Sequence, residues 1–208
     1  HQKKYGTRDE TFAKVSQKAR LHAKHNPRAI FRDEVSIEEV LSSPPMHGVL
    51  TRLQCCPPTC GAAAALLTSE KFTKKYGLRS DVKITGQSMT TDFPSSFEGK
   101  TMMQIVGSDM SQAAANDLYE RTGIGPDDVD VVELHDCFTS NEIITYEALQ
   151  LTEEGGSEQF VSDGENTYGG KVVVNPSGGL LSKGHPLGAT GLGQCAELVW
   201  QLRGEAGP

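Results

Sequence analysis

The stretch Val131-Val-Glu-Leu-His-Asp-Cys-Phe138 decides the fold that we expect for this chain. Its apolar, β-branched beginning is typical of a strand that is buried on both faces. His135, Asp136 and Cys137 follow where this strand ends and where a helix over about 140–151 is predicted to begin. Ligands of open α/β sheets usually bind at the carboxyl ends of the strands. The stretch therefore predicts a layered α/β fold with a functional site at the end of this strand.

A second stretch, Lys183-Gly-His-Pro-Leu-Gly-Ala-Thr-Gly191, places an imidazole before a predicted helix that ends near Gly204. The positive end of a helix disfavours the protonated form of a histidine. A neutral His185 could accept a proton from a thiol or stabilise an oxyanion, because both are ordinary tasks of a neutral imidazole. A simple helix-capping role for His185 remains open from the pattern alone. The two stretches together indicate a Cys/His site, with Cys137 as its thiol.

Composition and charge exclude several classes of protein. The 20 Lys and Arg against 27 Asp and Glu give a formal charge of −7, which argues against a nucleic-acid-binding surface. Residues 1–32 are basic, however, and are predicted to form an amphipathic helix that either has a solvated face or contacts a phosphorylated ligand. No apolar run reaches the roughly 20 residues of a membrane span. With no secretory signal at its start, the chain is expected to be soluble and intracellular.

The five cysteines do not form the pattern of a disulfide framework or of a zinc site. Cys55, Cys56 and Cys60 lie close together, but their spacing is not that of a zinc finger and no histidine follows at the required distance. We therefore predict no metal, and we expect these thiols to pack as small apolar groups. Cys195 is expected on the buried face of the last helix.

The rest of the chain alternates between strand and helix signals. Capping boxes are predicted at Thr7–Glu10 and at Ser36–Glu39, and residues 1–48 are expected to contain no strand. Further elements are predicted as strands at 49–53, 82–86 and 172–174, helices at 69–77 and about 110–123, and loops at 91–97 and 163–170, the second of them within a polar, Gly-rich stretch over 153–170. No phosphate-binding loop, dinucleotide fingerprint or hydrolase elbow is present.

At these residues the chain resembles the thiolases, and in particular their peroxisomal sterol carrier protein X subfamily. His135-Asp-Cys-Phe138 matches the HDCF motif, Gly184-His-Pro186 matches the GHP motif, and Asn175-Pro-Ser-Gly-Gly179 is similar to the turn before it. The similarity extends to Cys55-Cys-Pro57, Gly61-Ala-Ala-Ala-Ala65 and Asp163–Gly170. Cys60 departs from the subfamily, which usually has Asp in this turn. The resemblance implies a thiolase fold, with two similar βαβαβαββ halves in αβαβα layers and an inserted loop domain.

On this plan the chain covers only part of a thiolase. Residues 1–48 would be the end of the loop domain, and residues 49–78 would be the last strand and helix of the N-terminal half. Residues 79–208 would be the C-terminal half without its final strands. The family's nucleophilic cysteine, in a CxS motif, belongs to the N-terminal half, and none of the five cysteines here occupies its position. We therefore expect the chain alone to be inactive.

The resemblance also implies an activity and the residues that perform it. A 3-oxoacyl-CoA thiolase cleaves a β-keto thioester with coenzyme A as co-substrate, without a permanently bound cofactor. His185 would activate the nucleophile and form an oxyanion hole with His135, and Cys137 would move the proton at the enolate carbon. The residues implied to contact the substrate or coenzyme A are Gly184, Pro186, Ser177 and Gly178.

The same resemblance suggests the setting of the protein. It implies a homodimer in the β-oxidation of fatty acids, branched chains or sterol side chains in peroxisomes, with mitochondrion and cytoplasm as alternative locations. Two other functions stay open at this point. One is a non-catalytic thiolase-like subunit that binds acyl-CoA, and the other is a thiolase-like retro-aldolase, which needs no covalent cysteine.

Overall fold

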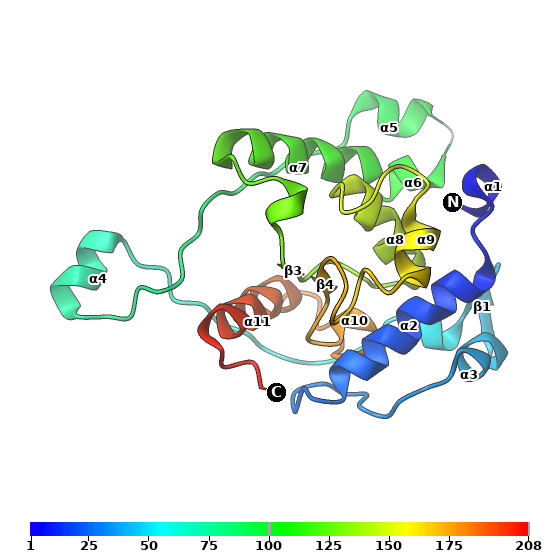
Figure 1. Ribbon diagram of the computed structural model, residues 1–208, viewed down its shortest axis with the longest axis horizontal. Coiled ribbons are helices and arrows are strands. Elements are labelled where there is room, and N and C mark those ends of the chain that lie inside the picture. The colour runs from blue at the N-terminus through cyan, green and yellow to red at the C-terminus, as the bar shows by residue number, and fades with distance from the viewer. Residues whose placement is uncertain (100, 208) are drawn as a thin grey trace.

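The computed structural model describes residues 1–99 and 101–207 as a helical body with a long extension (Figure 1). The helices are α1 (Gln2–Tyr5), α2 (Asp9–Ala23), α3 (Ile37–Ser42), α4 (Glu70–Tyr76), α5 (Pro94–Glu98), α6 (Met102–Ile105), α7 (Ser108–Thr122), α8 (Thr139–Ala148), α9 (Ser157–Ser162), α10 (Gly179–Ser182) and α11 (Thr190–Arg203). The strands are β1 (Pro45–His47), β2 (Leu50–Thr51), β3 (Val131–Val132) and β4 (Val173–Val174), and two 3-10 turns are η1 (Arg52–Gln54) and η2 (Pro126–Asp128). None of the helices in the described part of the chain combines the length and apolar character needed to cross a membrane.

A short parallel ladder lies at the centre of the body. β3 pairs with β4 in the register Val131 with Val173 and Val132 with Val174. The amide of Asn175 extends this ladder by donating to the carbonyl of Val132 at 2.7 Å. The strand predicted before His135 is therefore in its expected place, but it is only two residues long. β1 and β2 form a separate antiparallel pair.

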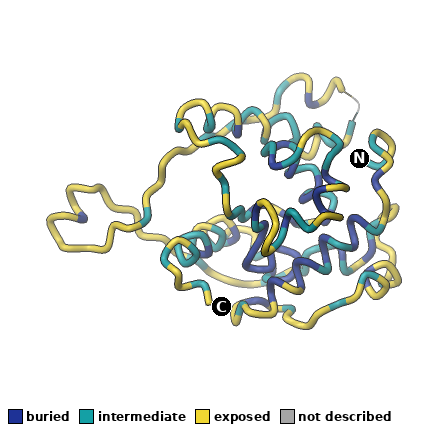
Figure 2. Tube along the Cα trace, viewed as in Figure 1, coloured by how far each residue is buried: buried dark blue, intermediate teal, exposed yellow. Residues whose placement is uncertain are grey.

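Helix α2 covers the ladder and the helices beside it. It packs against α8, α9 and α10, as its place across the body shows (Figure 1). The buried apolar core joins these elements through Phe12, Val15, Ala19, Leu134, Ile143, Tyr146, Leu151, Phe160, Val161, Val172, Val174 and Leu181. Burial is concentrated along α2 and around β4, whereas the extension that carries α4 is almost entirely exposed (Figure 2). The hydrophobic core thus lies on the α2 side of the ladder.

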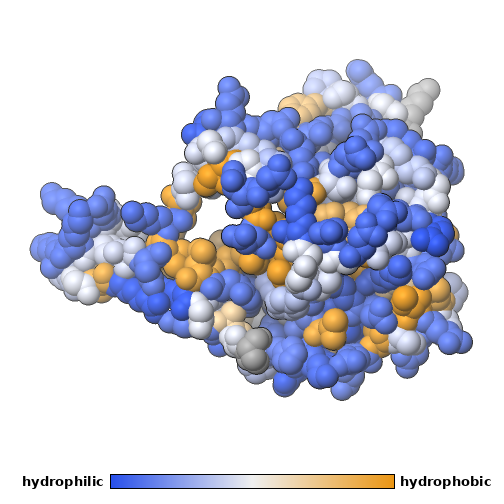
Figure 3. Space-filling view, viewed as in Figure 1, coloured by the Kyte–Doolittle hydropathy of each residue, from blue (hydrophilic) through white to orange (hydrophobic). Residues whose placement is uncertain are grey.

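The extension keeps strand-like sequences without a strand partner. Its apolar side chains stay in contact with solvent, and Leu66, Ile84 and Met89 are 85%, 70% and 86% exposed. Apolar surface gathers where the extension leaves the body (Figure 3). The predicted strand at 82–86 is wrong for this structure, because an isolated extended segment has no ladder hydrogen bonds to hold it. The αβαβα layers of the expected fold are accordingly only partly present within residues 1–99 and 101–207.

Several local predictions are confirmed by the helix boundaries. The Ser36–Glu39 capping box is formed, with Glu39 N donating to Ser36 Oγ at 3.1 Å and Ser36 N donating to Glu39 Oε2 at 2.7 Å. Helix α4 begins after Ser69 and ends at Gly77, as predicted. Helices α7, α8 and α11 lie where the apolar spacing places them, and α11 ends at Gly204.

Other local predictions are wrong. Thr7 does not cap α2, because its hydroxyl is bonded to His1 Nδ1 at 2.5 Å and Arg8 occupies the cap position. Residues 1–48 do contain a strand, β1, and the predicted strand at 49–53 turns into η1 after two residues. The predicted loop at 91–97 contains the start of helix α5, with a proline at the first position of that helix, where its missing N–H costs nothing. The predicted loop at 163–170, by contrast, follows α9 without a helix or strand, as expected.

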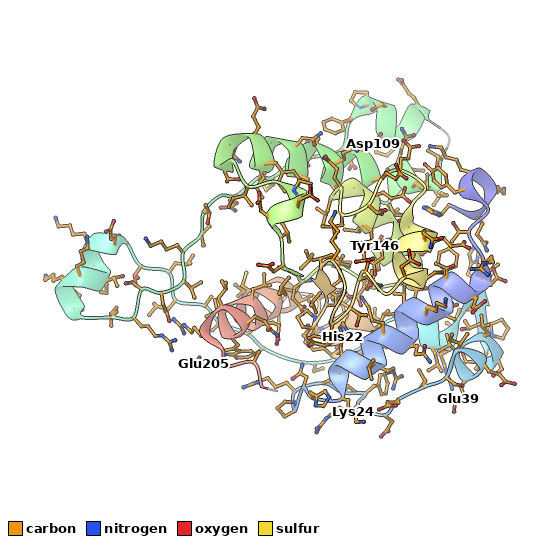
Figure 4. The ribbon with its side chains drawn as sticks, viewed as in Figure 1. His22, Lys24, Glu39, Asp109, Tyr146 and Glu205 are labelled. Carbon is orange, nitrogen blue, oxygen red and sulfur yellow. The ribbon has the colours of Figure 1, made fainter. Side chains whose placement is uncertain are left out.

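A buried polar network holds α2 against α8 and the turn after β4. Glu142 Oε1 accepts short hydrogen bonds from Lys18 Nζ and from the Tyr146 hydroxyl, and Glu142 Oε2 accepts from Asn175 Nδ2 at 3.1 Å. Lys18 Nζ also donates to the carbonyl of Val174 at 3.0 Å. Tyr146 lies in this interior, as does the network's neighbour His22 (Figure 4). Because each buried charge has several partners, the network avoids the large cost of an unpaired buried ion.

His22 links α2 to the same turn in its neutral form. Its side chain is 1% exposed, and its Nδ1 and Nε2 lie 3.0 Å from the carbonyl oxygen of Asn175 and 2.7 Å from Thr167 Oγ1. Burial, with a contribution from the charge of Lys18, lowers the pKa of His22 from 6.5 to about 4. The unfolded chain therefore binds a proton at His22 between these two pH values while the folded chain does not.

We predict that His22 makes the chain sensitive to acid. Its contribution to the free energy of unfolding is fully present above pH 6.5 and is lost as the pH falls through about 4. In His22→Gln the loss of stability between pH 7.5 and 4.5, measured by urea unfolding, should be smaller by about 2 to 3 kcal/mol than in the unsubstituted protein. His25→Gln, at an exposed histidine, is the matched control. An equal loss in the His22 variant and the control would contradict the prediction.

Candidate functional site

The residues after β3 alternate between the surface and the core. His135 is exposed, Asp136 is fully buried, and Cys137 is half-buried. Successive side chains of an extended segment point to opposite faces, so His135 and Cys137 lie on one side and Asp136 on the other. Asn141 Nδ2, from the first turn of α8, fixes this geometry by donating to the carbonyl of His135 at 2.6 Å. The strand end thus presents an imidazole and a thiol side by side.

His185 reaches the same place from the other end of the chain. It follows α10 and Gly184, whose φ of 111° belongs to a region that glycine adopts readily and other residues rarely adopt. The rings of His135 and His185 meet edge to face, with 4.8 Å between their centroids and 89° between their planes. The structure therefore brings together His135 and His185, two of the three residues that the sequence singles out as catalytic, and the third, Cys137, follows His135 at the same strand end.

Both imidazoles are held toward their neutral forms. Burial lowers the pKa of His135, and the neighbouring His185 lowers it further. Burial likewise lowers the pKa of His185, with Lys183 adding to the effect. His185 lies in the turn before α11 rather than in the first turn of that helix. Neutral imidazoles can act as bases and as hydrogen-bond donors near pH 7.

Thr190, at the start of α11, orients the ring of His185. The Thr190 hydroxyl donates to the carbonyl of Pro186 at 3.2 Å and lies 2.8 Å from His185 Nδ1. Since the hydroxyl hydrogen is already used, this oxygen accepts from Nδ1–H. The other ring nitrogen, Nε2, then carries the lone pair.

A segment that the sequence analysis did not place at the site forms one of its walls. The amide of Cys56 donates to the carbonyl of Cys137 at 2.8 Å, and Cys55 forms an antiparallel bridge with Phe138. Pro58 forms a parallel bridge with His185, so residues 55–58 run between the two motifs. The prolines of this segment give no periodic signal, and only the pairing in three dimensions reveals its place.

The thiols at this wall are protonated at neutral pH. Burial raises the pKa of Cys137, and the charge of Asp136 raises it further. Burial raises the pKa of Cys56 to about 11, with a contribution from Cys137. At neutral pH Cys137 therefore carries its proton, and it can donate this proton before it can accept one. Among the described residues, no group of three His, Cys, Asp or Glu side chains is arranged to hold a metal ion.

The residues expected to bind substrate or coenzyme A separate into two pairs. Gly184 and Pro186 line a pocket of about 360 Å³ beside the His185 loop. Ser177 and Gly178 are buried and do not line it. The Ser177 hydroxyl donates to Glu133 Oε2 at 2.9 Å, and a Cβ on Gly178 would lie 2.5 Å from Ala23 Cβ. Ser177 and Gly178 thus anchor the turn in this structure.

Two cations at the pocket come from separate parts of the chain. Arg28 and Lys183 line its wall, and the guanidinium of Arg28 lies 4.1 Å from the ring centroid of Trp200 on α11. The basic segment of residues 1–32 is otherwise uneven, because Lys18 and Arg20 are buried.

Helix α11 has little cover. Of its residues only Thr190 and Glu197 are buried, and Cys195 is exposed. The prediction that Cys195 lies on a buried face is wrong, because no layer packs against the apolar side of α11 within the described residues.

Comparison with known proteins gives the relationship of the chain. Residues 96–208 match the family model for "Thiolase C-terminal domain-like". Sterol carrier protein 2 of Oryctolagus cuniculus is 60% identical over all 208 residues, which are 38% of its own length. Benzoylsuccinyl-CoA thiolase subunit BbsB of Thauera aromatica is 42% identical over 96% of this chain and 51% of its own. The chain thus spans about half or less of these relatives.

A solved structure shows the same fold. The Ltp2-ChsH2(DUF35) aldolase superposes with a TM-score of 0.82 at 22% identity, covering 99% of this chain and 53% of that one. This similarity concerns the fold, since the identity is low. Because the family model matches more than half of the sequence, the chain belongs to the thiolase family.

Proposed function

We propose that this chain provides the acid/base and oxyanion-binding part of a 3-oxoacyl-CoA thiolase. The observation that carries the proposal is the contact between the rings of His135 and His185, 4.8 Å apart, with Cys137 on the same side of the strand end as His135. The substrate would be a β-keto acyl-CoA and the co-substrate coenzyme A. Membership in the thiolase family supports this substrate class.

In the proposed reaction, a cysteine thiolate attacks the keto carbon and the bond between Cα and Cβ breaks. The electron pair of that bond passes to the thioester, whose oxygen becomes an enolate oxyanion. His135 and His185 lie where both can donate hydrogen bonds to one oxyanion, and such donors stabilise charge that develops in the transition state. Cys137 then gives its proton to Cα, releasing acetyl-CoA or propionyl-CoA. Coenzyme A then loses its thiol proton to the Cys137 thiolate and attacks the acyl-enzyme, so that the nucleophilic cysteine leaves as a thiolate, regains its proton from His185 and releases a shortened acyl-CoA.

The hydrogen bond at Thr190 sets the order of events at His185. With Nδ1–H bonded to Thr190 Oγ1, the free Nε2 of the neutral ring can only accept a proton. His185 therefore acts first as the base that deprotonates the nucleophile. Once Nε2 is protonated, it becomes a donor to the oxyanion. His135 can donate from the start if its outward-facing nitrogen carries the hydrogen.

The nucleophile of this reaction is not among the cysteines that the chain contains. Cys137 is required as the acid at Cα, and Cys55 and Cys56 lie on the wall behind it. Cys60 is exposed at the wall of the pocket beside His185, in the turn where the subfamily usually has Asp, and Cys195 is exposed on α11. We assign residues 1–48, 49–78 and 79–208 to the end of the loop domain, the end of the N-terminal half and the C-terminal half, and we place the nucleophile in the remainder of the N-terminal half.

The pocket beside His185 suggests how coenzyme A is held. Gly184 and Pro186 give it a narrow wall at the reacting end, and Arg28 and Lys183 add positive charge that suits phosphate groups. Peroxisomal β-oxidation is the setting that the similarity to sterol carrier protein 2 favours. A homodimer would cover part of the apolar surface that the extension and α11 expose.

Thr190→Val should lower kcat in the complete enzyme. Without the hydroxyl, His185 loses the partner that fixes its tautomer, so a fraction of the rings has the hydrogen on the wrong nitrogen. General-base catalysis typically contributes about 100-fold or more, and we expect a loss on the order of 10- to 100-fold. Steady-state thiolysis of acetoacetyl-CoA measures it. Thr190→Ser, which keeps the hydroxyl, should remain near the starting activity; equal activity of the Val and Ser variants would refute the assignment.

His135→Ala should lower kcat by about 100-fold, as for other single oxyanion donors, with little change in KM. The exposed His47→Ala is the matched control and should leave both constants unchanged. If the change were confined to KM, His135 would be a binding residue and not an oxyanion donor.

The 208-residue chain by itself should not catalyse thiolysis. Purified chain incubated with acetoacetyl-CoA and coenzyme A should release no acetyl-CoA, and intact-mass spectrometry should detect no acyl thioester on the protein. Exchange of the α-proton of a bound acyl-CoA remains possible, because it needs only acid/base groups. Turnover that disappears when one of the five cysteines is replaced would place the nucleophile within the chain and overturn the assignment.

A further inference from the structure

Asp136 lies between two residues of the proposed site and faces away from both. Its side chain is 0% exposed, whereas His135 is exposed and Cys137 is half-buried. The carboxyl group therefore takes no part in binding substrate. A buried carboxyl is costly unless it is hydrogen-bonded, so its partners are informative.

The partners of Asp136 are backbone amides of α10. Oδ1 accepts from the amide of Leu180 at 2.7 Å, and Oδ2 lies 3.5 Å from the amide of Leu181. These amides belong to the first turn of α10, where no helical carbonyl is available to them. The carboxyl thus caps α10 from a different segment of the chain.

Gly179 makes this approach possible. A Cβ built on Gly179 would lie 2.1 Å from Asp136 Oδ2, closer than any real contact. Its φ of 59° also lies in the left-handed region that favours glycine. The last glycine of the Asn-Pro-Ser-Gly-Gly turn is therefore required by its close contact with Asp136 and by its left-handed backbone conformation.

Helix α10 leads directly to the second histidine. It ends at Ser182, and Lys183 and Gly184 alone separate it from His185. A shift of α10 therefore moves His185, whereas His135 is attached to Asp136 through one peptide bond. The carboxyl group of Asp136 therefore links the strand end that carries His135 to the helix that leads to His185.

We propose, building on the proposed function, that Asp136 is a positioning residue whose carboxyl group holds α10 and so keeps His185 against His135. Three neighbouring hydrogen bonds hold only the base of the turn: Asn175 Oδ1 accepts from Leu134 N at 2.8 Å, and Glu133 accepts from both the amide and the hydroxyl of Ser177. Asp136 is the member of this set that reaches the helix itself.

The surroundings allow Asp136 to keep this role in either protonation state. Burial and the carboxylates of Glu142 and Glu133 raise its pKa to about 8, against the opposing effects of the Leu180 amide and Lys18. A protonated carboxyl retains an unprotonated oxygen that accepts the short bond from Leu180. The capping contact therefore does not require a buried negative charge.

The test compares Asp136→Ala with Asp136→Asn, which keeps one acceptor oxygen. NMR of the histidine rings needs no turnover, so it tests the positioning separately from the proposed reaction. In the unsubstituted protein, cross-relaxation should connect the His135 and His185 rings, and both should titrate below the usual pH. In Asp136→Ala this signal should disappear and the pKa of His135 should rise toward its ordinary value. Asp136→Asn should restore both features in large part.

A second variant and a control protect the test against misfolding. Gly179→Ala disturbs the same contact from the helix side and should also abolish the ring-to-ring signal. Ser182→Ala is the matched control on α10, because the buried Ser182 Oγ has no hydrogen-bond partner among the described residues, and it should change nothing. If Asp136→Ala fails to fold, the ring-to-ring signals of Asp136→Asn and Gly179→Ala decide whether Asp136 positions His185. Persistence of the His135–His185 signal in a folded Asp136→Ala or Gly179→Ala protein would overturn the proposal.

Turnover provides the second readout. In the complete enzyme, Asp136→Ala should lower kcat at least about 10-fold through misplacement of His185, with KM for coenzyme A unchanged and with recovery in Asp136→Asn. Loss of the ring contact without any thiolase activity in the unsubstituted enzyme would retain the positioning role and reject the proposed function. A rise in KM with unchanged kcat would reject the positioning role.

Discussion

The attachment of the turn 175–181 to the end of β3 is the constraint on which the rest of the site depends. Asn175, with a φ of 55°, turns the chain out of β4 while its side-chain oxygen takes the amide of Leu134. A non-glycine residue in this conformation is strained, and its side-chain and backbone hydrogen bonds offset the strain. The turn can therefore have only one orientation relative to the strand, which fixes the direction in which α10 leaves it.

The buried network behind this turn contributes specificity more than stability. A buried pair such as Lys18 with Glu142 loses hydration on folding, and that cost can exceed its Coulomb attraction. The stability comes instead from the apolar side chains around it, such as Ile143 and Leu151, each worth about 1.5 to 3 kcal/mol when fully buried. What the polar groups add is a penalty for any other arrangement. A shift of α2 would separate the buried Lys18 from Glu142 and from the carbonyl of Val174, which leaves its charge without partners.

The sequence predicts the site better than the sheet, for physical reasons. His135, Cys137 and His185 stand at element boundaries that local signals mark, so their convergence follows from parallel pairing of β3 with β4. Residues 82–86 have an equally high β-strand propensity. A strand also needs a neighbouring strand to pair with, and the propensity of a segment does not reveal whether one is present. The prediction for Cys195 is wrong for the same reason. Helical spacing predicts that α11 has an apolar face, but it does not predict whether another element covers that face. The wall at residues 55–58 had no local signal at all, since proline-rich segments reveal their place only through pairing.

The distribution of burial explains how a site can be well ordered beside so much exposed apolar surface. The elements that hold His135 and His185 are α2, α8, α10 and the β3–β4 pair, and they form the densest part of the core. The extension around α4 is exposed, and in α11 only Glu197 is buried beyond Thr190. Asp136 and Thr190 are buried, and Asn141 lies in the first turn of α8, whose inner face belongs to the core. Their hydrogen bonds therefore fix the geometry of the imidazoles without any further layer. A covering layer would then complete the site by excluding water, which strengthens the same hydrogen bonds to a developing oxyanion.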